Sequence, residues 1–197
     1  SLQDYLEALN QHILGAGLTR TRQRTTQCEG CDCCCSERIP LTNIDLYVLQ
    51  KGLKSQGEER SLAEVLRRYT YVIGEGHSVD ITLARDEVGA CVFLDPTERK
   101  CRIYPFRPLV CQTYICSPIS SKAKALRERI VNLGEDQLAQ WCLTNIPWDQ
   151  FFNEVWEPEI SLEDWQDTPF KDQVTYAAIP IKKICEPKLW QAIFISS

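Results

Sequence analysis

Five of the eleven cysteines in this chain lie within residues 28–35, in the run Cys28-Glu-Gly-Cys31-Asp-Cys33-Cys34-Cys35. A single buried cysteine packs as a small apolar group, but five neighbouring thiols cannot all face one core. Disulfides between neighbours are strained, because the bond needs Cα atoms about 5.5 Å apart. Converging thiolates bind soft metal ions, and the C-x2-C-x2-C spacing of Cys28, Cys31 and Cys34 is typical of iron–sulfur proteins and overlaps the C-x2-C unit of zinc sites. The run therefore predicts a metal site.

The remaining composition narrows the choice of metal. Eleven cysteines is a high and odd number, and in a reducing compartment such a set binds metal more often than it forms disulfides. The chain has only two histidines, His12 and His77, so a metal site must be built almost entirely from sulfur. Sulfur ligands select zinc or iron–sulfur clusters over copper(II), nickel or magnesium.

A second group of cysteines occupies positions 91, 101, 111 and 116. The segments Cys91-Val-Phe-Leu and Cys101-Arg-Ile-Tyr flank a polar turn at Asp95-Pro96, a pattern that predicts a β-hairpin. In such a hairpin Cys91 and Cys101 would lie near one another across the two strands. Because prolines at 105 and 108 prevent a regular helix there, we expect a short helix to begin only around residue 110 and to carry Cys111.

The other segments predict an α+β fold, a mainly helical single domain with a short β-hairpin. Apolar residues recur at helical spacing in residues 2–14, and the start of two further helices is marked by Thr42 and by the capping box Ser61-Leu-Ala-Glu64. Residues 78–84 alternate between apolar and polar and predict a strand. Residues 122–133 and 135–142 are expected to form two helices separated by Gly134.

Length and composition are those of an ordinary soluble domain. The chain has 197 residues, of which 44% are hydrophobic and 25% charged, and this is enough apolar material to bury a core. No apolar run approaches the roughly 18 residues that a membrane span requires. The first residues form an amphipathic segment without the charged and then apolar parts of a signal peptide. We expect a cytoplasmic protein with a cysteine-cluster domain and N-terminal helix at 1–134, and an acidic, tryptophan-rich C-terminal extension at 135–197 packed on it.

The net charge of −5 hides a strong asymmetry. Residues 99–129 contain eight basic side chains and one acidic one, whereas residues 135–172 contain ten acidic side chains and one basic one. A basic stretch with interleaved aromatics suits nucleic acid, but a sequence pI near 5.2 argues against it. We expect a protein partner instead; the sequence does not fix the oligomeric state.

The two cysteine groups together resemble the YkgJ-like cysteine-cluster family, which is described as a zinc- or iron-chelating domain and is related to the flagellin lysine N-methylases. The resemblance rests on C-x2-C-x2-C-C at 28–35 and on Cys91-x-Phe-Leu, Cys101-x-Ile-Tyr and Arg107-Pro108-x2-Cys111. It implies a fold organised around a cysteine-ligated metal centre with the ligands Cys28, Cys31, Cys34, Cys35, Cys91, Cys101, Cys111 and Cys116. Cys33 is additional to the pattern, and Cys142 and Cys185 lie outside it and are expected to be packed thiols.

The residues around this centre suggest further contacts. The Arg107 guanidinium cannot lose its charge, so it either hydrogen-bonds loop carbonyls or donates to cluster sulfurs or a bound anion. Cys33 and His77 are the other candidates for contacts next to the metal ligands.

The identity of the metal stays open between two alternatives. A [4Fe-4S] cluster is favoured, because C-x2-C-x2-C plus one distant cysteine is a common way to hold it, whereas a four-sulfur zinc site usually pairs two separate C-x2-C units. The cluster would serve a redox, cluster-delivery or methyl-transfer-related role; a structural zinc would instead hold a module for protein–protein interaction. No dinucleotide-binding, Walker-type or radical S-adenosylmethionine motif occurs, so the sequence leaves open whether the protein is an enzyme.

Overall fold

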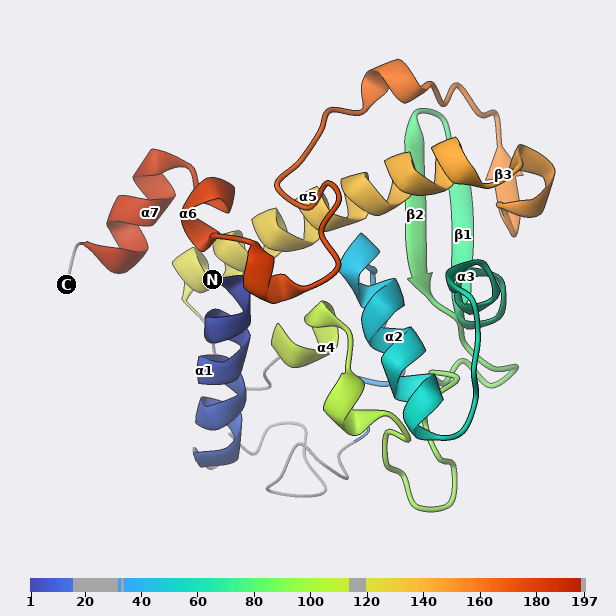
Figure 1. Ribbon diagram of the computed structural model, residues 1–197, viewed down its shortest axis with the longest axis horizontal. Helices are drawn as coiled ribbons and strands as arrows, with labels where there is room; N and C mark the ends of the chain where they lie inside the picture. The colour runs from blue at the N-terminus through green and yellow to red at the C-terminus, as the bar shows by residue number, and fades with distance from the viewer. Residues whose placement is uncertain (16–31, 33, 114–119, 196–197) are drawn as a thin grey trace.

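The structure is a computed structural model that describes residues 1–15, 32, 34–113 and 120–195 (Figure 1). It is an α+β fold that is mainly helical, as the sequence predicts. The elements are, in chain order, α1 (Leu2–Gly15), α2 (Asn43–Ser55), α3 (Leu62–Tyr69), β1 (Thr70–Glu75), β2 (Ser78–Leu83), η2 (Tyr104–Phe106), α4 (Leu109–Thr113), α5 (Ser121–Asn145), η3 (Trp148–Gln150), β3 (Glu154–Trp156), η4 (Leu162–Asp164), η5 (Tyr176–Ala178), α6 (Ile181–Ile184) and α7 (Pro187–Phe194).

The strands form a sheet in the order β2-β1-β3. β1 and β2 are an antiparallel hairpin that turns at Gly76, whose φ of 53° lies in the left-handed region that glycine adopts without strain. β3 joins the other edge of β1 in parallel. The predicted strand at 78–84 is confirmed as β2, and the extended segment 39–41 lies against its free edge through the bond from Leu41 N to Ile81 O, 2.9 Å.

α5 crosses the whole molecule beside this sheet (Figure 1). The prediction of two helices separated by Gly134 is wrong, because Gly134 lies inside one continuous helix. Its role is close packing: a Cβ atom at this position would lie 2.4 Å from Thr42 Cγ2. The missing side chain lets α5 approach the start of α2, and the helix ends only at Asn145.

Asp45, in the first turn of α2, connects three distant parts of the chain. Its carboxylate accepts hydrogen bonds from the backbone N of Thr42 (2.8 Å), from the backbone N of Leu109 (2.7 Å) and from the Tyr176 hydroxyl. The side chain is fully buried, and burial raises its pKa whereas the hydrogen bonds from Tyr176, Thr42 and Leu109 oppose that shift. One carboxylate therefore joins the start of α2, the start of α4 and the C-terminal segment.

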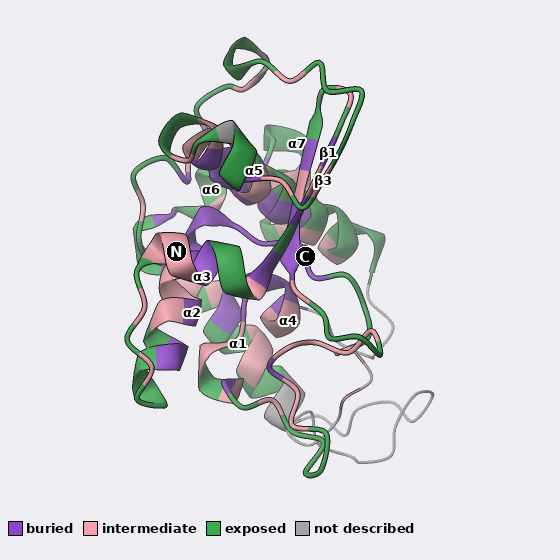
Figure 2. Ribbon diagram, turned by 90° about the vertical axis from the view of Figure 1, so that its right-hand side faces the viewer, coloured by how far each residue is buried: buried purple, intermediate pink, exposed green. Residues whose placement is uncertain are grey.

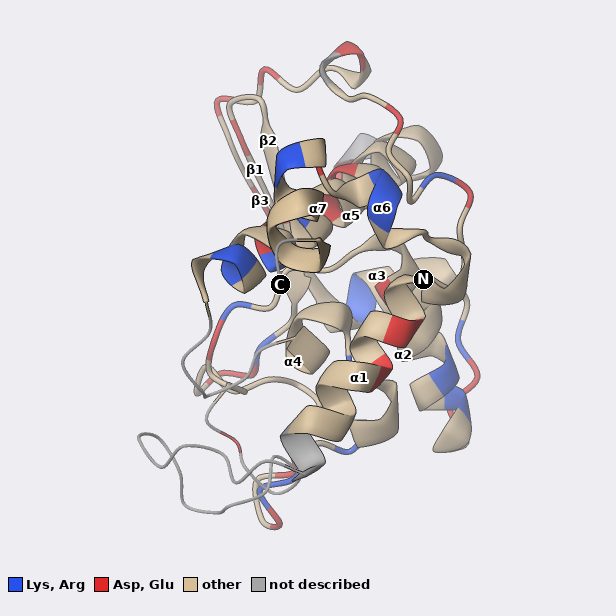
Figure 3. Ribbon diagram, turned by 90° about the vertical axis from the view of Figure 1, so that its left-hand side faces the viewer, with Lys and Arg blue, Asp and Glu red and all other residues tan. Residues whose placement is uncertain are grey.

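The C-terminal segment packs on the remainder of the molecule. Asn43 Nδ2 donates to the carbonyl oxygens of Phe170 (2.9 Å) and Gln173 (3.2 Å), and Leu2 N donates to Ile179 O at 2.8 Å. By contrast, the acidic segment that follows β3 and carries η4 is exposed along most of its length (Figures 2 and 3). The division of the chain at residue 134, which falls within α5, stays a prediction.

Removal of the Asp45 carboxylate tests its structural role. In Asp45→Ala the buried donors of Leu109 and Tyr176 lose their acceptor, so we expect the free energy of unfolding to fall by about 3 kcal/mol. The matched control is Glu64→Ala, which removes an exposed carboxylate from the capping box of α3 and should cost about 1 kcal/mol or less. Denaturant unfolding of both variants measures the difference; equal losses would contradict the role of Asp45.

Glu135 provides a half-buried carboxyl group, between α5 and β2. Its Oε1 accepts from Ile81 N at 3.2 Å, and burial, together with the neighbouring Asp80 carboxylate, raises its pKa to about 8. In the unfolded chain the pKa returns to its ordinary value near 4.5. The folded state therefore binds the Glu135 proton more tightly between these two values.

The pH dependence of stability follows from this difference. The contribution of Glu135 is fully present below pH 4.5 and is lost as the pH rises toward 8. In Glu135→Gln the decline of unfolding free energy over this interval should become shallower, whereas Glu128→Gln, at an exposed position of the same helix, should leave it unchanged. Denaturation at several pH values checks this; identical profiles for wild type and Glu135→Gln would contradict it.

Candidate metal centre

Five cysteines from both sequence groups line one cavity. Cys34 and Cys35 come from the turn before residue 39, Cys91 and Cys101 from the loop after β2, and Cys111 from α4. The remaining walls are mostly apolar and are formed by Ile39, Leu83, Phe93, Ile103, Tyr104, Arg107 and Pro108. The fold thus brings together thiols that lie up to 77 positions apart in the sequence, from Cys34 to Cys111.

A backbone hydrogen bond and an ion pair hold the two cysteine groups against each other. Cys91 N donates to Cys35 O at 2.8 Å, and Arg99 forms an ion pair with Asp32, which lies within the first group. These contacts join the residues around Cys35 to the loop that carries Cys91 and Cys101.

The loop from Cys91 to Cys101 is not the predicted hairpin. The hairpin of the fold is β1–β2, and residues 91–101 form turns with one isolated bridge, between Leu94 and Cys101. The turn at Asp95 forms as predicted, but the two segments that flank it turn locally: Leu94 N donates to Cys91 O at 2.9 Å and Tyr104 N donates to Cys101 O at 3.2 Å, so neither segment extends into a strand ladder. Cys91 and Cys101 nevertheless line the same cavity.

α4 places Cys111 in the cavity wall. The helix begins at Leu109, directly after Pro108, as expected, and the Leu109 N–H donates to the buried Asp45 carboxylate. Leu109 is fully buried, so the first turn of α4 is fixed by both a hydrogen bond and packing. Asp45 was not among the predicted site residues, although the capping pattern Thr42-x-x-Asp45 is visible in the sequence.

The apolar surroundings keep most of these thiols protonated. Burial raises the pKa of Cys91 to about 11 and that of Cys111 well above its ordinary value, and other thiols in the cavity add to both shifts. A thiolate here needs a nearby cation, because its charge is poorly hydrated. The donor set is therefore one that a soft metal ion fits, since the metal replaces the thiol protons and supplies the missing positive charge.

Cys34 differs from the other thiols in the cavity. Its pKa is lowered to about 7, first because the Cys35 thiol donates a hydrogen bond to it and further because of the Arg107 charge. The same contact raises the pKa of Cys35. Cys34 is thus the described thiol most readily deprotonated, and its thiolate is the form that binds metal.

Arg107 contributes a fixed positive charge to the cavity wall. Its Nε donates to Tyr104 O at 3.1 Å, one terminal nitrogen donates to Asn10 Oδ1 at 3.0 Å, and the guanidinium lies 3.9 Å from the centre of the Tyr104 ring. Asn10 also donates to Gln112, so α1 is attached to the site at two points. Asn10 was not among the predicted site residues, because a single asparagine in a helix carries no recognisable signal.

The other predicted site residues fall outside this cavity or outside the described structure. Cys28, Cys31, Cys33 and Cys116 lie outside the described residues. His77 is on the β1–β2 turn, where it pairs with Glu159 at 3.2 Å, and it does not line the cysteine cavity. Cys142 and Cys185 are buried away from the cavity, as expected of packed thiols. Within the described part of the chain, no three Cys, His, Asp or Glu side chains are placed closely enough to hold a metal ion.

A protein-family model matches more than half of the chain. Residues 27–142 match the CxxCxxCC family, described as a "putative zinc- or iron-chelating domain". This range contains both cysteine groups and every residue that lines the cavity. No solved structure matches the chain. Among the helices that the structure describes, none has the length and apolar character to cross a membrane.

Substitution of single cysteines tests the assignment of the cavity. Cys101→Ser replaces a cavity thiol with a poor ligand for soft metals, so the purified protein should contain much less metal than wild type. Cys185→Ser, at a buried cysteine elsewhere, is the matched control and should keep its metal. Elemental analysis per mole of protein measures both; equal metal contents would contradict the assignment.

Proposed function

Since the chain belongs to the CxxCxxCC family of zinc- or iron-chelating domains, we propose that the cysteine cavity is its chelation site and holds a [4Fe-4S] cluster. The observation that carries the proposal is the convergence of five thiols, from both cysteine groups, on one mostly apolar cavity. The proposed ligands come from Cys28, Cys31, Cys34 and Cys35 in the first group and from Cys91, Cys101, Cys111 and Cys116 in the second.

The donor set supports iron–sulfur chemistry over zinc. The first group supplies C-x2-C-x2-C, and a cluster needs only one further thiolate, which Cys91 or Cys101 from the facing loop or Cys111 from α4 would supply. A four-sulfur zinc site usually takes two ligands from each of two C-x2-C units, and the second group contains no such unit.

The surroundings of the cavity suit a redox or cluster-carrying role. A bound cluster would supply one-electron transfer, and its potential depends on burial and on hydrogen bonds and charges near the sulfurs. Arg107 is held in the wall by Tyr104 and Asn10, so its charge stabilises thiolates there and offsets part of the negative charge of a thiolate-bound cluster. Arg107 is therefore proposed to act next to the ligands, as a positioning and charge-balancing residue.

The proposed setting is a reducing, cytoplasmic compartment with a protein partner that receives electrons or the cluster. Free thiols next to one another persist where disulfides do not form. Support for a protein partner comes from Val155 and Trp156, which lie on the edge strand β3 with 41% and 58% of their surface exposed. An exposed tryptophan on a sheet edge is typical of protein contacts, whereas the acidic total charge argues against nucleic acid.

A structural zinc ion is the alternative, and one experiment separates the two. The protein is purified without oxygen, its metals are quantified, and its absorption is recorded before and after dithionite. The proposal predicts brown protein with about four iron atoms and matching sulfide per chain, and a broad band near 400 nm that bleaches on reduction. Colourless protein with stoichiometric zinc would overturn the cluster and leave the zinc-bound interaction module. Protein with neither metal would overturn chelation at this site.

A further inference from the structure

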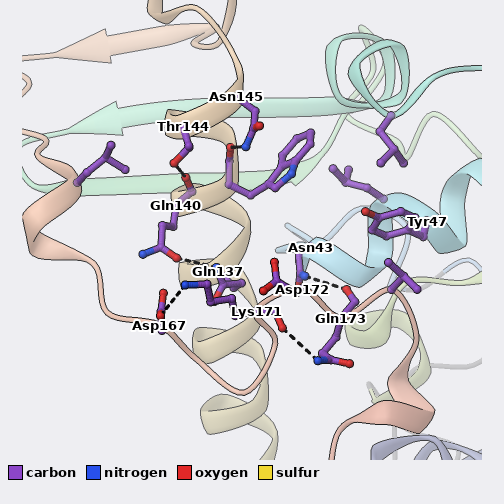
Figure 4. Close-up of a pocket in the computed structure, with 15 residues that line it drawn as sticks. Asn43, Tyr47, Gln137, Gln140, Thr144, Asn145, Asp167, Lys171, Asp172 and Gln173 are labelled. Carbon is purple, nitrogen blue, oxygen red and sulfur yellow. Dashed lines mark hydrogen bonds and ion pairs between the residues drawn. The ribbon is translucent and has the colours of Figure 1, made fainter.

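A second cavity, of about 570 Å³, lies between α2, the C-terminal half of α5 and residues 162–174 (Figure 4). None of the cysteines that the structure describes lines it, and it shares no residue with the cysteine cavity. Its volume is within the range of pockets that bind small molecules. The polar lining residues, labelled in Figure 4, are Asn43, Tyr47, Gln137, Gln140, Thr144, Asn145, Asp167, Lys171, Asp172 and Gln173, and the apolar ones are Leu46, Leu62, Trp141, Leu162 and Val174.

Asn43 presents an unsatisfied acceptor in this cavity. The residue exposes 9% of its surface, and its Nδ2 already donates to the carbonyl oxygens of Phe170 and Gln173. Its Oδ1 is buried and has no hydrogen-bond partner within the described structure. A buried amide oxygen without a donor costs free energy, so a ligand that donates to it gains that energy on binding.

Several side-chain donors around the cavity are already engaged within the protein. Gln137 Nε2 donates to Gln140 Oε1 (2.6 Å), Gln140 Nε2 to Trp165 O (3.3 Å), and Gln173 Nε2 to Lys171 O (3.2 Å). At the end of α5 the Thr144 hydroxyl and Asn145 Nδ2 both donate to carbonyls one turn earlier, at 2.7 Å each. These donors serve partners within the protein, so the buried Asn43 Oδ1 remains an acceptor that a donor on the ligand would satisfy.

The charged groups around the cavity favour a positively charged ligand. Lys171 is paired with Asp167 at 2.7 Å, and in the part of the chain that the structure describes no side chain forms an ion pair with Asp172. The C-terminal end of α5, with Thr144 and Asn145 in the wall, carries the negative end of the helix dipole and has no basic residue in its last turn. The Asp172 carboxylate and the C-terminal end of α5 favour a cation over an anion at this position.

The aromatic side chains select a flat cation. Trp141 and Tyr47 line the same cavity, and aromatic faces attract cations and stack on planar ones. A guanidinium group is planar and carries N–H donors along its edges, so it stacks on aromatic rings and pairs with a carboxylate through two parallel hydrogen bonds. An ammonium group also donates hydrogen bonds, but it is not planar and does not form this two-pronged pair. Asp172 precedes Gln173, whose carbonyl contacts Asn43, so the carboxylate and the free Oδ1 belong to one corner of the cavity.

We propose that this cavity binds a guanidinium group, with Asp172 and Asn43 Oδ1 as acceptors and Trp141 and Tyr47 as the aromatic contacts. The group is carried either by a small molecule or by an arginine side chain of a peptide, since the chemistry of recognition is the same. The proposal does not depend on the metal centre, because the two cavities share no residue.

The test is calorimetric titration of the purified full chain with agmatine, butylamine, urea and a short neutral peptide that contains one arginine. Agmatine or the arginine peptide should bind saturably, with butylamine at least about tenfold weaker and urea without measurable binding. If agmatine alone binds tightly, the guanidinium group belongs to a small molecule. If the peptide alone binds tightly, the group belongs to an arginine side chain of a peptide. No binding of either guanidinium probe, or equal binding of butylamine, would overturn the proposal.

Asp172→Asn is the variant of choice, because it removes the charge while keeping a residue that tolerates the positive φ of 58° at this position. It should weaken guanidinium binding about tenfold or more while circular dichroism shows the fold intact. Glu163→Gln removes an acid from the same acidic segment at an exposed position that does not line the cavity, and it should bind as wild type does. Equal affinities for wild type and Asp172→Asn would overturn the assignment of Asp172.

Discussion

The buried carboxylate of Asp45 is the contact on which the arrangement of this molecule depends. It receives hydrogen bonds from the starts of α2 and α4 and from Tyr176 near the C-terminus. Because α4 carries Cys111, the position of this cavity thiol is tied to the packing of the C-terminal segment. A change at either place is transmitted through one side chain, so the stability of the fold and the geometry of the cysteine cavity are coupled.

The cavity surrounds several thiols with mostly apolar walls, where the charge of a thiolate would be poorly hydrated. Burial and mutual repulsion raise the pKa values of Cys91, Cys101 and Cys111, while Arg107 opposes the shift at Cys101 and Cys111. Such a site is stabilised by a bound cation, and the free energy of metal binding then becomes part of the free energy of folding. Membership in a family of zinc- or iron-chelating domains agrees with this chemistry.

The features that local rules decide were predictable from the sequence. The helix starts at Thr42 and Ser61 and the strand at 78–84 follow from short patterns, and the structure confirms them. Two predictions failed: Gly134 is a packing residue inside α5, and turns that begin at Cys91 and Cys101 limit the predicted hairpin to one bridge, between Leu94 and Cys101. The free Oδ1 of Asn43 and the second cavity arise only when α2, α5 and the C-terminal segment meet.

The most direct test of the central claim is X-ray absorption spectroscopy at the iron and zinc edges on oxygen-protected protein, because it identifies the metal and its neighbouring atoms together. The account predicts a first shell of sulfur at about 2.3 Å and, for a cluster, a second shell of iron. A first shell made of oxygen or nitrogen would contradict the claim that the cysteine cavity holds the metal.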